Sequence, residues 1–338
     1  RFKISKELKK DKKYRECEVD YETYLDDLNK KKEDLNHNFI FFEDVNELID
    51  SSDALLVSTP TKYAPIYTLE ALKRNKNVFC EKPPSRTLLE LKEIENFSND
   101  STFNSVLAYG FNHRLHDSVI KIKELIDSKD LGKVLWMRGR YGKEVDDTYK
   151  TSWRCNKELN GGGILIDQGI HLLDLMNFLS GGFDFVQSVL SSNYLKIKDV
   201  EDNAFLNLMC KKSGIAASLH STITQWRYLF SLEIFLEKGS IVLNGLRTSS
   251  GNYGNEVLTI HPERGGTVNN TKEDLTFQYN ENNSWKKEML TFISACKEKK
   301  KYPFSGLKDA KTIMKLIDDV YKNALFSICP IIAGTGQK

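Results

Sequence analysis

Short apolar runs alternate with amphipathic stretches along the first 109 residues, and this alternation constrains the fold more than any other feature of the chain. Residues 54–57, 78–80 and 106–109 have the length and composition of buried strands. Residues 66–74 and 88–97, which lie between them, have the apolar spacing of helices. Strands and helices that alternate in this way predict a parallel, doubly wound α/β sheet. Ligands of such a sheet bind at the carboxyl ends of its strands.

The N-terminal residues add further elements to this pattern. We predict a helix over residues 2–14, strands over 16–20 and 39–42, a charged helix over 24–35 and a helical turn over 45–49. These elements would complete the same doubly wound sheet.

The pattern changes after about residue 115. Apolar residues take every second position over residues 204–210 and 232–236, which is typical of half-buried antiparallel strands. A further strand is expected over 134–141, helices over 119–126, 163–179, 285–296 and 307–321, and long surface loops over 249–283. We therefore predict two domains, an α/β domain over residues 1–114 and an α+β domain with an open, mainly antiparallel sheet over residues 115–338.

Composition limits the classes of partner. The chain of 338 residues carries 49 basic and 47 acidic side chains, so its charge gives no reason to expect nucleic acid or an anionic membrane as a partner. The six cysteines are scattered without a CxxC pair or a Cys/His spacing that would suit zinc, which predicts a cytoplasmic protein without a metal site. No apolar run approaches the roughly 20 residues of a membrane-spanning helix.

The stretch CEKPPS, residues 80–85, places an ionisable pair at the end of a predicted strand. Glu81 and Lys82 would emerge at the carboxyl edge of the sheet, where ligands bind. Pro83 restricts Lys82 to extended backbone angles and makes a cis peptide bond more accessible, which would fix the direction of the amine. The alternative is a surface Glu/Lys pair beside a turn.

A second group of ionisable residues lies in the stretch GGGILIDQGIHLLDL, residues 161–175. At about 100° per residue, Asp167, His171 and Asp174 would share a narrow stripe on an otherwise apolar helix. Buried carboxylates and imidazoles need partners or a polar cleft. With Lys82, the stripe supplies an imidazole, a carboxylate and a cation for proton transfer at a secondary alcohol. The alternative is a satisfied core histidine.

A glycine-rich turn, which a dinucleotide-binding sheet normally carries after its first strand, is absent before Gly110. Either this half binds no dinucleotide, or the first strand and its turn lie upstream of Arg1. The chain opens without methionine on a helix-like pattern, and Asp20 ends the next predicted strand, where a ribose-binding acid is expected. We expect the second explanation, while Asp20 as a solvated turn residue stays open.

The order of several motifs resembles one protein family. The motifs are LLVSTPTKYA, KNVFCEKPPS, YGFNHRL, LGKV, SWRCNKELNGGGILIDQGIHLLDL and, near the end, LKDAKTIMKLIDDVYKNA. Over residues 50–185 and 305–325 the chain resembles the glucose-fructose oxidoreductase, inositol dehydrogenase and MocA family (Gfo/Idh/MocA). The resemblance implies a Rossmann-like nicotinamide-binding domain and a second domain whose open sheet forms an oligomer interface. It also implies oxidation or reduction of a hydroxyl group on a sugar, a nucleotide-linked sugar or a cyclitol.

The resemblance also implies roles for particular residues. Lys82, Asp167 and His171 look like the catalytic group, with His171 accepting the hydroxyl proton. The expected cofactor contacts, for NAD or NADP, are Asp20, Ser58, Thr59, Pro60, Glu81, Lys82 and Pro83. The expected substrate contacts are Asn112, Arg114, Tyr149, Trp153, Arg154, Asp167 and His171.

Two other classes of function stay open at this point. If the glycine-rich turn is truly absent, the chain would be a sugar-binding or assembly protein without dinucleotide binding. A hydrolase or lyase that uses the nicotinamide only transiently is a third hypothesis. The expected partners are a small sugar, nucleotide-sugar or cyclitol and further copies of the chain in a homo-oligomer.

Overall fold

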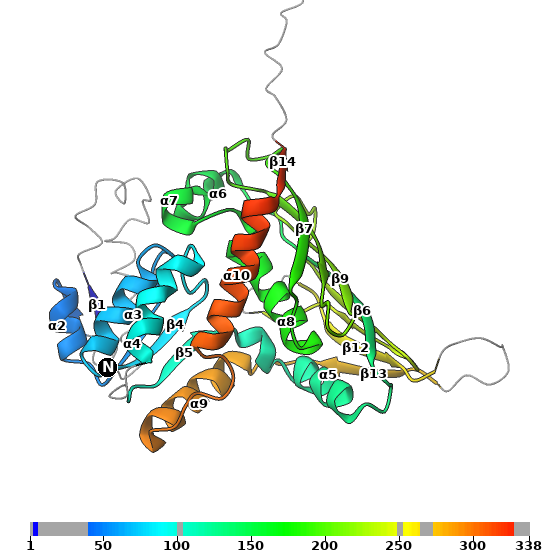
Figure 1. Cartoon of the computed structure of the whole chain (residues 1–338), viewed down its shortest axis with the longest axis horizontal. Helices are drawn as coiled ribbons and strands as arrows, with labels where there is room; N and C mark the ends of the chain where they lie inside the picture. Colours follow the sequence, from blue (N-terminus) through cyan, green and yellow to red (C-terminus); the bar gives the residue numbers. More distant parts are fainter. Residues whose placement is uncertain (1–2, 6–39, 100–103, 249–252, 264–272, 328–338) are drawn as a thin grey trace, which may run out of the picture.

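The computed structural model of the chain describes residues 3–5, 40–99, 104–248, 253–263 and 273–327. A small parallel sheet with its helices lies beside a large open sheet, and further helices lie between the two (Figure 1). This architecture confirms the predicted fold class, a doubly wound α/β unit with a second, mainly antiparallel domain.

The small sheet contains three parallel strands in the order β3, β4, β5. These elements are β3 (Ala54–Val57), α3 (Ala64–Lys73), β4 (Asn77–Glu81), η3 (Leu88–Leu91), α4 (Lys92–Ser98) and β5 (Leu107–Gly110). In the central strand β4, Val78, Phe79 and Cys80 are all fully buried. A continuous apolar run is what a parallel strand needs when both of its faces are covered. The carboxyl end of β4 carries Glu81 and Lys82, as the sequence predicted.

The prediction for the first residues was wrong. Residues 3–5, expected within a helix, form strand β1 (Lys3–Ser5), which pairs in parallel with β2 (Ile40–Phe42) ahead of α2 (Val45–Asp50). Backbone pairing with a distant strand outweighs local helix propensity here, because propensity is a weak prior. The strand predicted over 16–20 and the helix predicted over 24–35 lie outside the described residues.

The second domain is built on a nine-stranded sheet with the order β13-β12-β11-β10-β6-β9-β8-β7-β14. Its strands are β6 (Val134–Gly142), β7 (Phe185–Ser191), β8 (Asn203–Met209), β9 (Ala216–Thr222), β10 (Leu229–Leu236), β11 (Ser240–Asn244), β12 (Glu256–His261), β13 (Leu275–Tyr279) and β14 (Leu325–Ser327). The neighbours β6 and β9 are parallel, as are β7 and β14, and the other pairs are antiparallel. The strands predicted over 204–210 and 232–236 are confirmed.

Residues 249–283 were predicted as surface loops, and this was wrong for two segments. β12 and β13 extend the edge of the large sheet beyond β11. In β12 the side chains of Glu256, Leu258 and Ile260 are buried, so the strand has the alternation of a half-buried sheet. Asparagine and glycine on both sides of this short run hide its strand pattern in the sequence.

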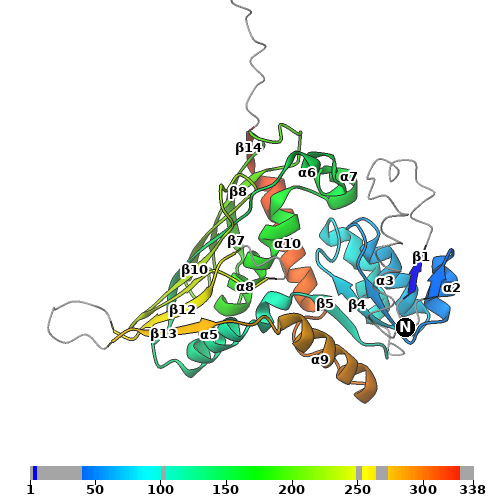
Figure 2. The same cartoon turned by 180° about the vertical axis from the view of Figure 1, so that it is seen from behind.

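Within the second domain, α5 (Asp117–Ser128), α8 (Ile170–Ser180) and α10 (Leu307–Asn323) cover one face of the large sheet, and the opposite face is open (Figures 1 and 2). The helices of this domain are η4 (Asn112–Leu115), α5 (Asp117–Ser128), α6 (Asp147–Thr151), η5 (Trp153–Cys155), α7 (Lys157–Asn160), η6 (Leu165–Gly169), α8 (Ile170–Ser180), α9 (Ser284–Glu298) and α10 (Leu307–Asn323). A Cβ atom on Gly139 of β6 would lie 2.9 Å from the Leu172 side chain, so this glycine lets α8 pack closely on the sheet. α10 contacts both β5 and β7 and thereby joins the small sheet to the large one.

Candidate active site

The end of β4 brings Lys82 to the interface between the two halves. The Lys82–Pro83 peptide bond is cis. The Lys82 amine donates a hydrogen bond of 2.5 Å to the main-chain oxygen of Asp167. Burial lowers the pKa of Lys82, against the opposing effect of the Asp167 and Glu81 carboxylates. The two motifs that the sequence singled out therefore meet in space.

The glycine run before Asp167 permits a close approach that no other residue could make. A Cβ atom on Gly163 would lie 2.0 Å from the main-chain oxygen of Glu201. The main-chain N–H groups of Gly163 and Leu165 donate to the Glu201 carboxylate at 2.9 and 2.8 Å. This buried carboxylate satisfies the first N–H groups of the segment and so anchors the turn that carries Asp167.

The segment with Asp167 is a π-helix, η6, that runs into α8. A π-helix closes its hydrogen bonds from i to i+5 and holds more residues per turn than an α-helix. The spacing of 100° per residue, on which the predicted stripe of Asp167, His171 and Asp174 depended, therefore does not apply across it. The three side chains have separate partners.

Asp174 belongs to a buried ion-pair network. Arg114 donates to Asp174 from Nε at 2.7 Å and from Nη2 at 2.5 Å, and its Nη1 lies 2.9 Å from Asp309. The Arg114 and Asp174 side chains are 4% and 1% exposed. These Arg114 nitrogens donate to groups of the protein itself. The sequence had predicted Arg114 as a substrate contact, but the structure places it in this buried network. It joins η4 to α8 and α10.

Asp167 is the centre of a cluster of polar contacts. Its Oδ2 accepts from Lys143 Nζ and from the Tyr149 hydroxyl, each at 3.0 Å. Its Oδ1 accepts from Arg154 Nε at 3.1 Å. Burial opposes the charge of this carboxylate, but Lys143, Lys82 and Arg154 outweigh burial and hold the pKa of Asp167 well below its usual range. Asp167 is therefore an anion that organises three donors.

A cleft of about 460 Å³ opens beside this cluster. It is lined by Lys143, Glu144, Val145, Asp146, Thr148, Tyr149, Ser152, Arg154 and Tyr228. Three of these residues are the donors that Asp167 holds, so the carboxylate sets the shape and charge of the cleft wall. Trp153 supports the wall, since the Arg154 guanidinium lies 4.5 Å from the centre of its ring. The volume is in the range of small-molecule sites.

His171 lies on α8 and is buried, with 8% of its surface exposed. Its Nδ1 atom is buried and has no hydrogen-bond partner among the described residues. Its ring stacks on His113, with centroids 3.9 Å apart and planes 14° apart. Burial, then Lys82 and His116, lower the pKa of His171 well below its usual range. The imidazole is therefore neutral and able to accept a proton.

Asn112, predicted as a substrate contact, is buried behind this histidine pair. Its Oδ1 lies 3.0 Å from His113 Nδ1, and its Nδ2 donates to Ser284 at 3.2 Å. The structure therefore brings Lys82, Asp167, Tyr149 and Arg154 together, and leaves Asn112 and Arg114 in supporting networks.

The cofactor contacts predicted at the end of β3 lie at the carboxyl edge of the small sheet. Ser58 is exposed, and Thr59 has a buried hydroxyl oxygen without a partner among the described residues. Next to Pro60, the Thr61 hydroxyl donates to Asn160 at 2.9 Å and ties this loop to α7. An unpaired hydroxyl at the ligand-binding edge fits a nicotinamide cofactor that hydrogen-bonds there. Asp20, the predicted ribose contact, lies outside the described residues.

Sequence reasoning missed Lys143 and His113. Lys143 directly follows β6 and binds the Asp167 carboxylate, a position at a strand end that the sequence could have flagged. His113 lies within the YGFNHRL motif, but stacking on His171 depends on packing between η4 and α8, which no spacing in the sequence reveals. In the described part of the chain, no group of three His, Cys, Asp or Glu residues could hold a metal ion, and no helix is long and apolar enough to cross a membrane.

Two family models match the chain. Residues 19–101 match the model described as "Oxidoreductase family, NAD-binding Rossmann fold", and residues 119–242 match the model described as "GFO/IDH/MocA C-terminal domain". The first range contains β3 and β4 with Lys82, and the second contains strands β6 to β10 of the large sheet with Asp167 and His171.

Relatives with assigned names include two dehydrogenases. Glucose-6-phosphate 3-dehydrogenase of Bacillus subtilis is 32% identical over 168 residues, which cover 49% of this chain and 47% of the relative. Myo-inositol 2-dehydrogenase of Thermotoga maritima is 27% identical over 243 residues, covering 66% of this chain and 68% of the relative. The chain thus spans about half the length of curated relatives such as the Bacillus enzyme.

Solved structures show the same fold. Levoglucosan dehydrogenase in complex with NADH and levoglucosan superposes with a TM-score of 0.75 at 21% identity, covering 87% of this chain and 84% of that one. KijD10, a 3-ketoreductase from Actinomadura kijaniata in complex with NADP, gives a TM-score of 0.73 at 19% identity, covering 89% and 87%. Taken with the matches to both family models, the arrangement of the two sheets shows that this chain belongs to the Gfo/Idh/MocA family of oxidoreductases.

Proposed function

We propose that the chain is a NAD(P)-dependent oxidoreductase that acts on a secondary hydroxyl of a sugar, a nucleotide-linked sugar or a cyclitol. The observation that carries this proposal is the convergence of Lys82 and Asp167 beside a polar cleft, with the neutral His171 one helical turn further along. Several relatives are named as sugar or inositol dehydrogenases, and these names support this class of reaction.

His171 is the proposed proton acceptor. When bound at the carboxyl ends of β3 and β4, the nicotinamide would accept the hydride that leaves the hydroxyl-bearing carbon. Ser58, Thr59, Pro60, Glu81, Lys82 and Pro83 would hold it there. The neutral imidazole of His171 accepts the hydroxyl proton as the alcohol becomes a ketone. The Lys82 ammonium stabilises negative charge that develops on the reacting oxygen.

Asp167 acts chiefly through the groups that it orients. Its Oδ2 already accepts two hydrogen bonds, whereas Oδ1 accepts one from Arg154 and keeps a lone pair for a substrate hydroxyl. Lys143, Tyr149 and Arg154 line the cleft and would bind the other oxygens of the substrate. A polar wall held by a buried anion suits a polyhydroxylated ligand.

A substrate screen tests this proposal. Sugars, sugar phosphates, nucleotide sugars and inositols are incubated with NAD or NADP, and formation of the reduced cofactor is followed by absorbance. We expect at least one compound to support turnover, and Lys82→Ala and His171→Ala to lower kcat by about 100-fold or more. Lys62→Ala, which alters a partly exposed lysine after β3, is the matched control and should retain activity. Full activity in both site variants would contradict the roles proposed for them.

A sugar-binding protein without catalysis is the second candidate function. The specific observation in its favour is the polar cleft of about 460 Å³, whose lining could hold a sugar without any transfer of hydride. Titration calorimetry separates the two candidates. The dehydrogenase binds NAD or NADP as well as a sugar, whereas the alternative binds the sugar and neither nucleotide.

We also propose that the open face of the large sheet joins copies of the chain in a homo-oligomer. Apolar side chains on this face are between 37 and 47% exposed, namely Trp136, Phe185, Val189, Phe205 and Met209. Cross-strand pairing places them side by side, since Phe185 opposes Met209 and Val189 opposes Phe205. Contiguous exposed apolar surface marks an interaction site.

A further inference from the structure

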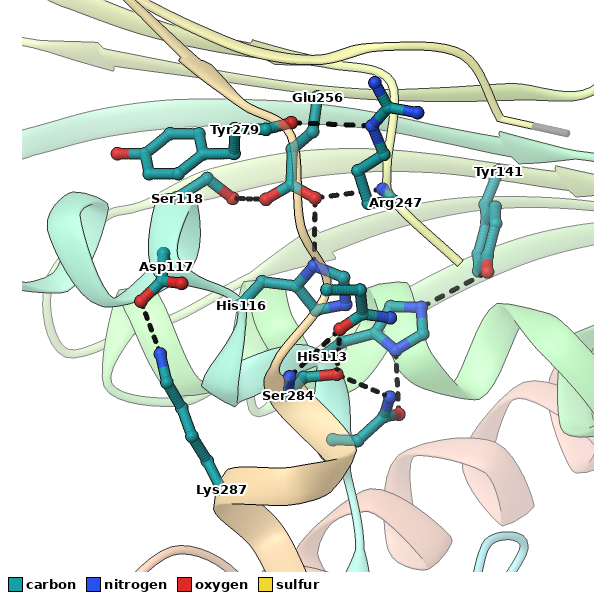
Figure 3. A network of polar contacts seen from close by, with 12 residues as sticks. His113, His116, Asp117, Ser118, Tyr141, Arg247, Glu256, Tyr279, Ser284 and Lys287 are labelled. Atoms are coloured by element: carbon teal, nitrogen blue, oxygen red, sulfur yellow. Dashed lines mark hydrogen bonds and ion pairs between the residues drawn. The ribbon is translucent and has the colours of Figure 1, made fainter. Parts of the chain in front are cut away.

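Two further histidines, His113 and His116, lie near the proposed base His171, and one of them contacts it directly. His113 stacks on His171 with ring centroids 3.9 Å apart. The centroid of the His116 ring lies 5.5 Å from that of His113 (Figure 3). Both nitrogens of His113 have partners, Nδ1 with Asn112 and Nε2 with the Tyr141 hydroxyl at 3.2 Å. The directions of these hydrogen bonds decide which nitrogen of His113 carries the proton.

A chain of hydrogen bonds that starts from a main-chain amide fixes the direction of the hydrogen bond at His113. The N–H of Ser284 donates to the side chain of Asn282 at 3.0 Å, so the accepting atom must be the amide oxygen. The Ser284 hydroxyl, 2.6 Å from the same oxygen, therefore donates to it. That hydroxyl can then only accept from Asn112, whose Nδ2 lies 3.2 Å away.

The orientation of Asn112 then fixes the tautomer of His113. With Nδ2 directed at Ser284, the Asn112 Oδ1 faces His113 Nδ1 and can only accept, so Nδ1 carries the proton. Nε2 is left with a lone pair, which accepts from the Tyr141 hydroxyl. A second proton on Nε2 would need this buried hydroxyl to give up the ring and turn to Tyr253, its other hydrogen-bond partner, so the network favours the neutral ring.

The charged groups around His113 act in the same direction. Burial, and then His171, His116 and Lys82, lower the pKa of His113 well below its usual range. His116 contacts the Glu256 carboxylate at 3.0 Å, and this carboxylate also accepts from Ser118 and from the main chain of Arg247 (Figure 3). Within this pair of histidines, it is therefore His116, and not His113, that lies beside a carboxylate.

We propose that His113 is a positioning residue for the base His171. Held as the neutral Nδ1–H tautomer, His113 presents an uncharged ring face to His171. This face fixes the orientation of the His171 imidazole while the imidazole takes up a proton. This inference rests on the proposed function, in which His171 accepts the hydroxyl proton. A flat, neutral ring holds the plane of His171 and adds no charge to those of Lys82 and His116, whereas a charged ring at 3.9 Å would repel the proton further.

The variant Asn112→Asp tests this role. Its carboxylate accepts from Nδ1–H as the amide does, but it favours a second proton on His113. Heteronuclear NMR of the imidazole nitrogens in the isotope-labelled full chain reports the protonation of each ring, and His171→Gln assigns the neighbouring signals. We expect Nδ1–H alone on His113 in the wild type across the neutral range. In Asn112→Asp we expect a second proton as the pH falls and, below that midpoint, a drop of about tenfold in kcat for oxidation that recovers above it.

Asn323→Asp, at an exposed position of α10, is the matched control and should keep both the wild-type spectrum and the wild-type pH profile. A proton on His113 Nε2 in the wild type would overturn the proposal, as would a doubly protonated His113 with an unchanged pH profile. Should Asn112→Asp fail to fold, the wild-type tautomer still decides. The NMR measurement of the tautomer needs no turnover. An inactive wild type would therefore contradict the proposed function, and the NMR spectrum would still test the state of His113.

Discussion

Asp167 shows how a single buried charge can define a site. Only 5% of its surface is exposed, yet it meets the ammonium groups of Lys82 and Lys143 and the guanidinium of Arg154. An isolated carboxylate at such a position would be neutralised, and here the surrounding cations keep it ionised. The same anion opposes the effect of burial on Lys82 and so helps to keep that amine charged.

We expect Asp167→Asn to be far more damaging than its small change in shape suggests. The amide leaves Lys143 and Arg154 without their ion-pair partner and frees both side chains from the cleft wall, so kcat/KM should fall by about 100-fold or more. Steady-state kinetics on the substrate found by screening measures the loss. Asp127→Asn, at an exposed ion pair of α5, is the control; equal activities of the two variants would refute the role of Asp167.

Glu288 is a second buried acid, and it makes stability depend on pH. It is 3% exposed, and burial, then the nearby Glu81, raise its pKa from 4.5 to about 9. Between these values the folded state holds a proton that the unfolded state has released. Its contribution to stability is therefore complete below pH 4.5 and is lost as the pH rises towards 9.

We expect Glu288→Gln to flatten this dependence. The neutral amide needs no proton, so the stability of the variant relative to the wild type should rise by about 3 kcal/mol as the pH increases from about 6 to about 8. Urea unfolding at the two pH values measures the difference in the free energy of unfolding. Glu93→Gln, at an exposed position of α4, should behave as the wild type does. Parallel pH profiles for wild type and Glu288→Gln would show that Glu288 ionises normally.

At the scale of elements, the turn before η6 depends on the absence of a side chain. A Cβ atom on Gly163 would meet the main chain of Glu201, which cannot move aside as a flexible side chain could. We expect Gly163→Ala to lower the free energy of unfolding by about 3 kcal/mol or more and to reduce activity, because Asp167 would be displaced. Thermal unfolding and kinetics measure both effects. Gly306→Ala, where a Cβ atom meets nothing within 4 Å, is the control, and a Gly163→Ala protein as stable as this control would be contrary to our account.

Elements with a strong local pattern could be predicted from the sequence, and those that depend on distant partners could not. β3, β4, α3 and α10 lie close to their expected positions because their apolar runs or 3.6-residue periodicity are clear. β1 depends on pairing with a strand 35 residues away in the chain, from Ser5 to Ile40, and β12 is short and flanked by loop residues.

The site shows the same division. The motifs indicated Lys82, Asp167 and His171, because burying an ionisable group at a strand end or on an apolar helix costs free energy unless the group is paired. The π-helix could not be predicted, because its main-chain hydrogen bonds leave no trace in the side-chain pattern. For the same reason the sequence did not reveal that Asp174 is separated from Asp167 and His171. The partner of Arg114 and the stacking of His113 likewise follow only from packing.

For the molecule as a whole, the open sheet face should determine the state of assembly. We expect Phe205→Glu to shift the protein towards monomers, because a carboxylate at the centre of an apolar contact costs several kcal/mol unless it is paired. Light scattering coupled to size-exclusion chromatography measures the mass of the wild type and of the variant. Lys212→Glu, in the turn after β8, controls for the change in charge. A wild-type protein that is monomeric at high concentration would rule out this interface.

The small sheet and the large sheet meet where Lys82 contacts the turn of Asp167, and the proposed transfer of hydride takes place at this junction. The most direct measurement is mass spectrometry of the nicotinamide after turnover of a sugar that carries deuterium on the carbon of its reacting hydroxyl. We predict that the reduced cofactor gains one deuterium and that His171→Gln slows this transfer by about 100-fold or more. A sugar that is bound or cleaved while no deuterium enters the cofactor would contradict the central claim.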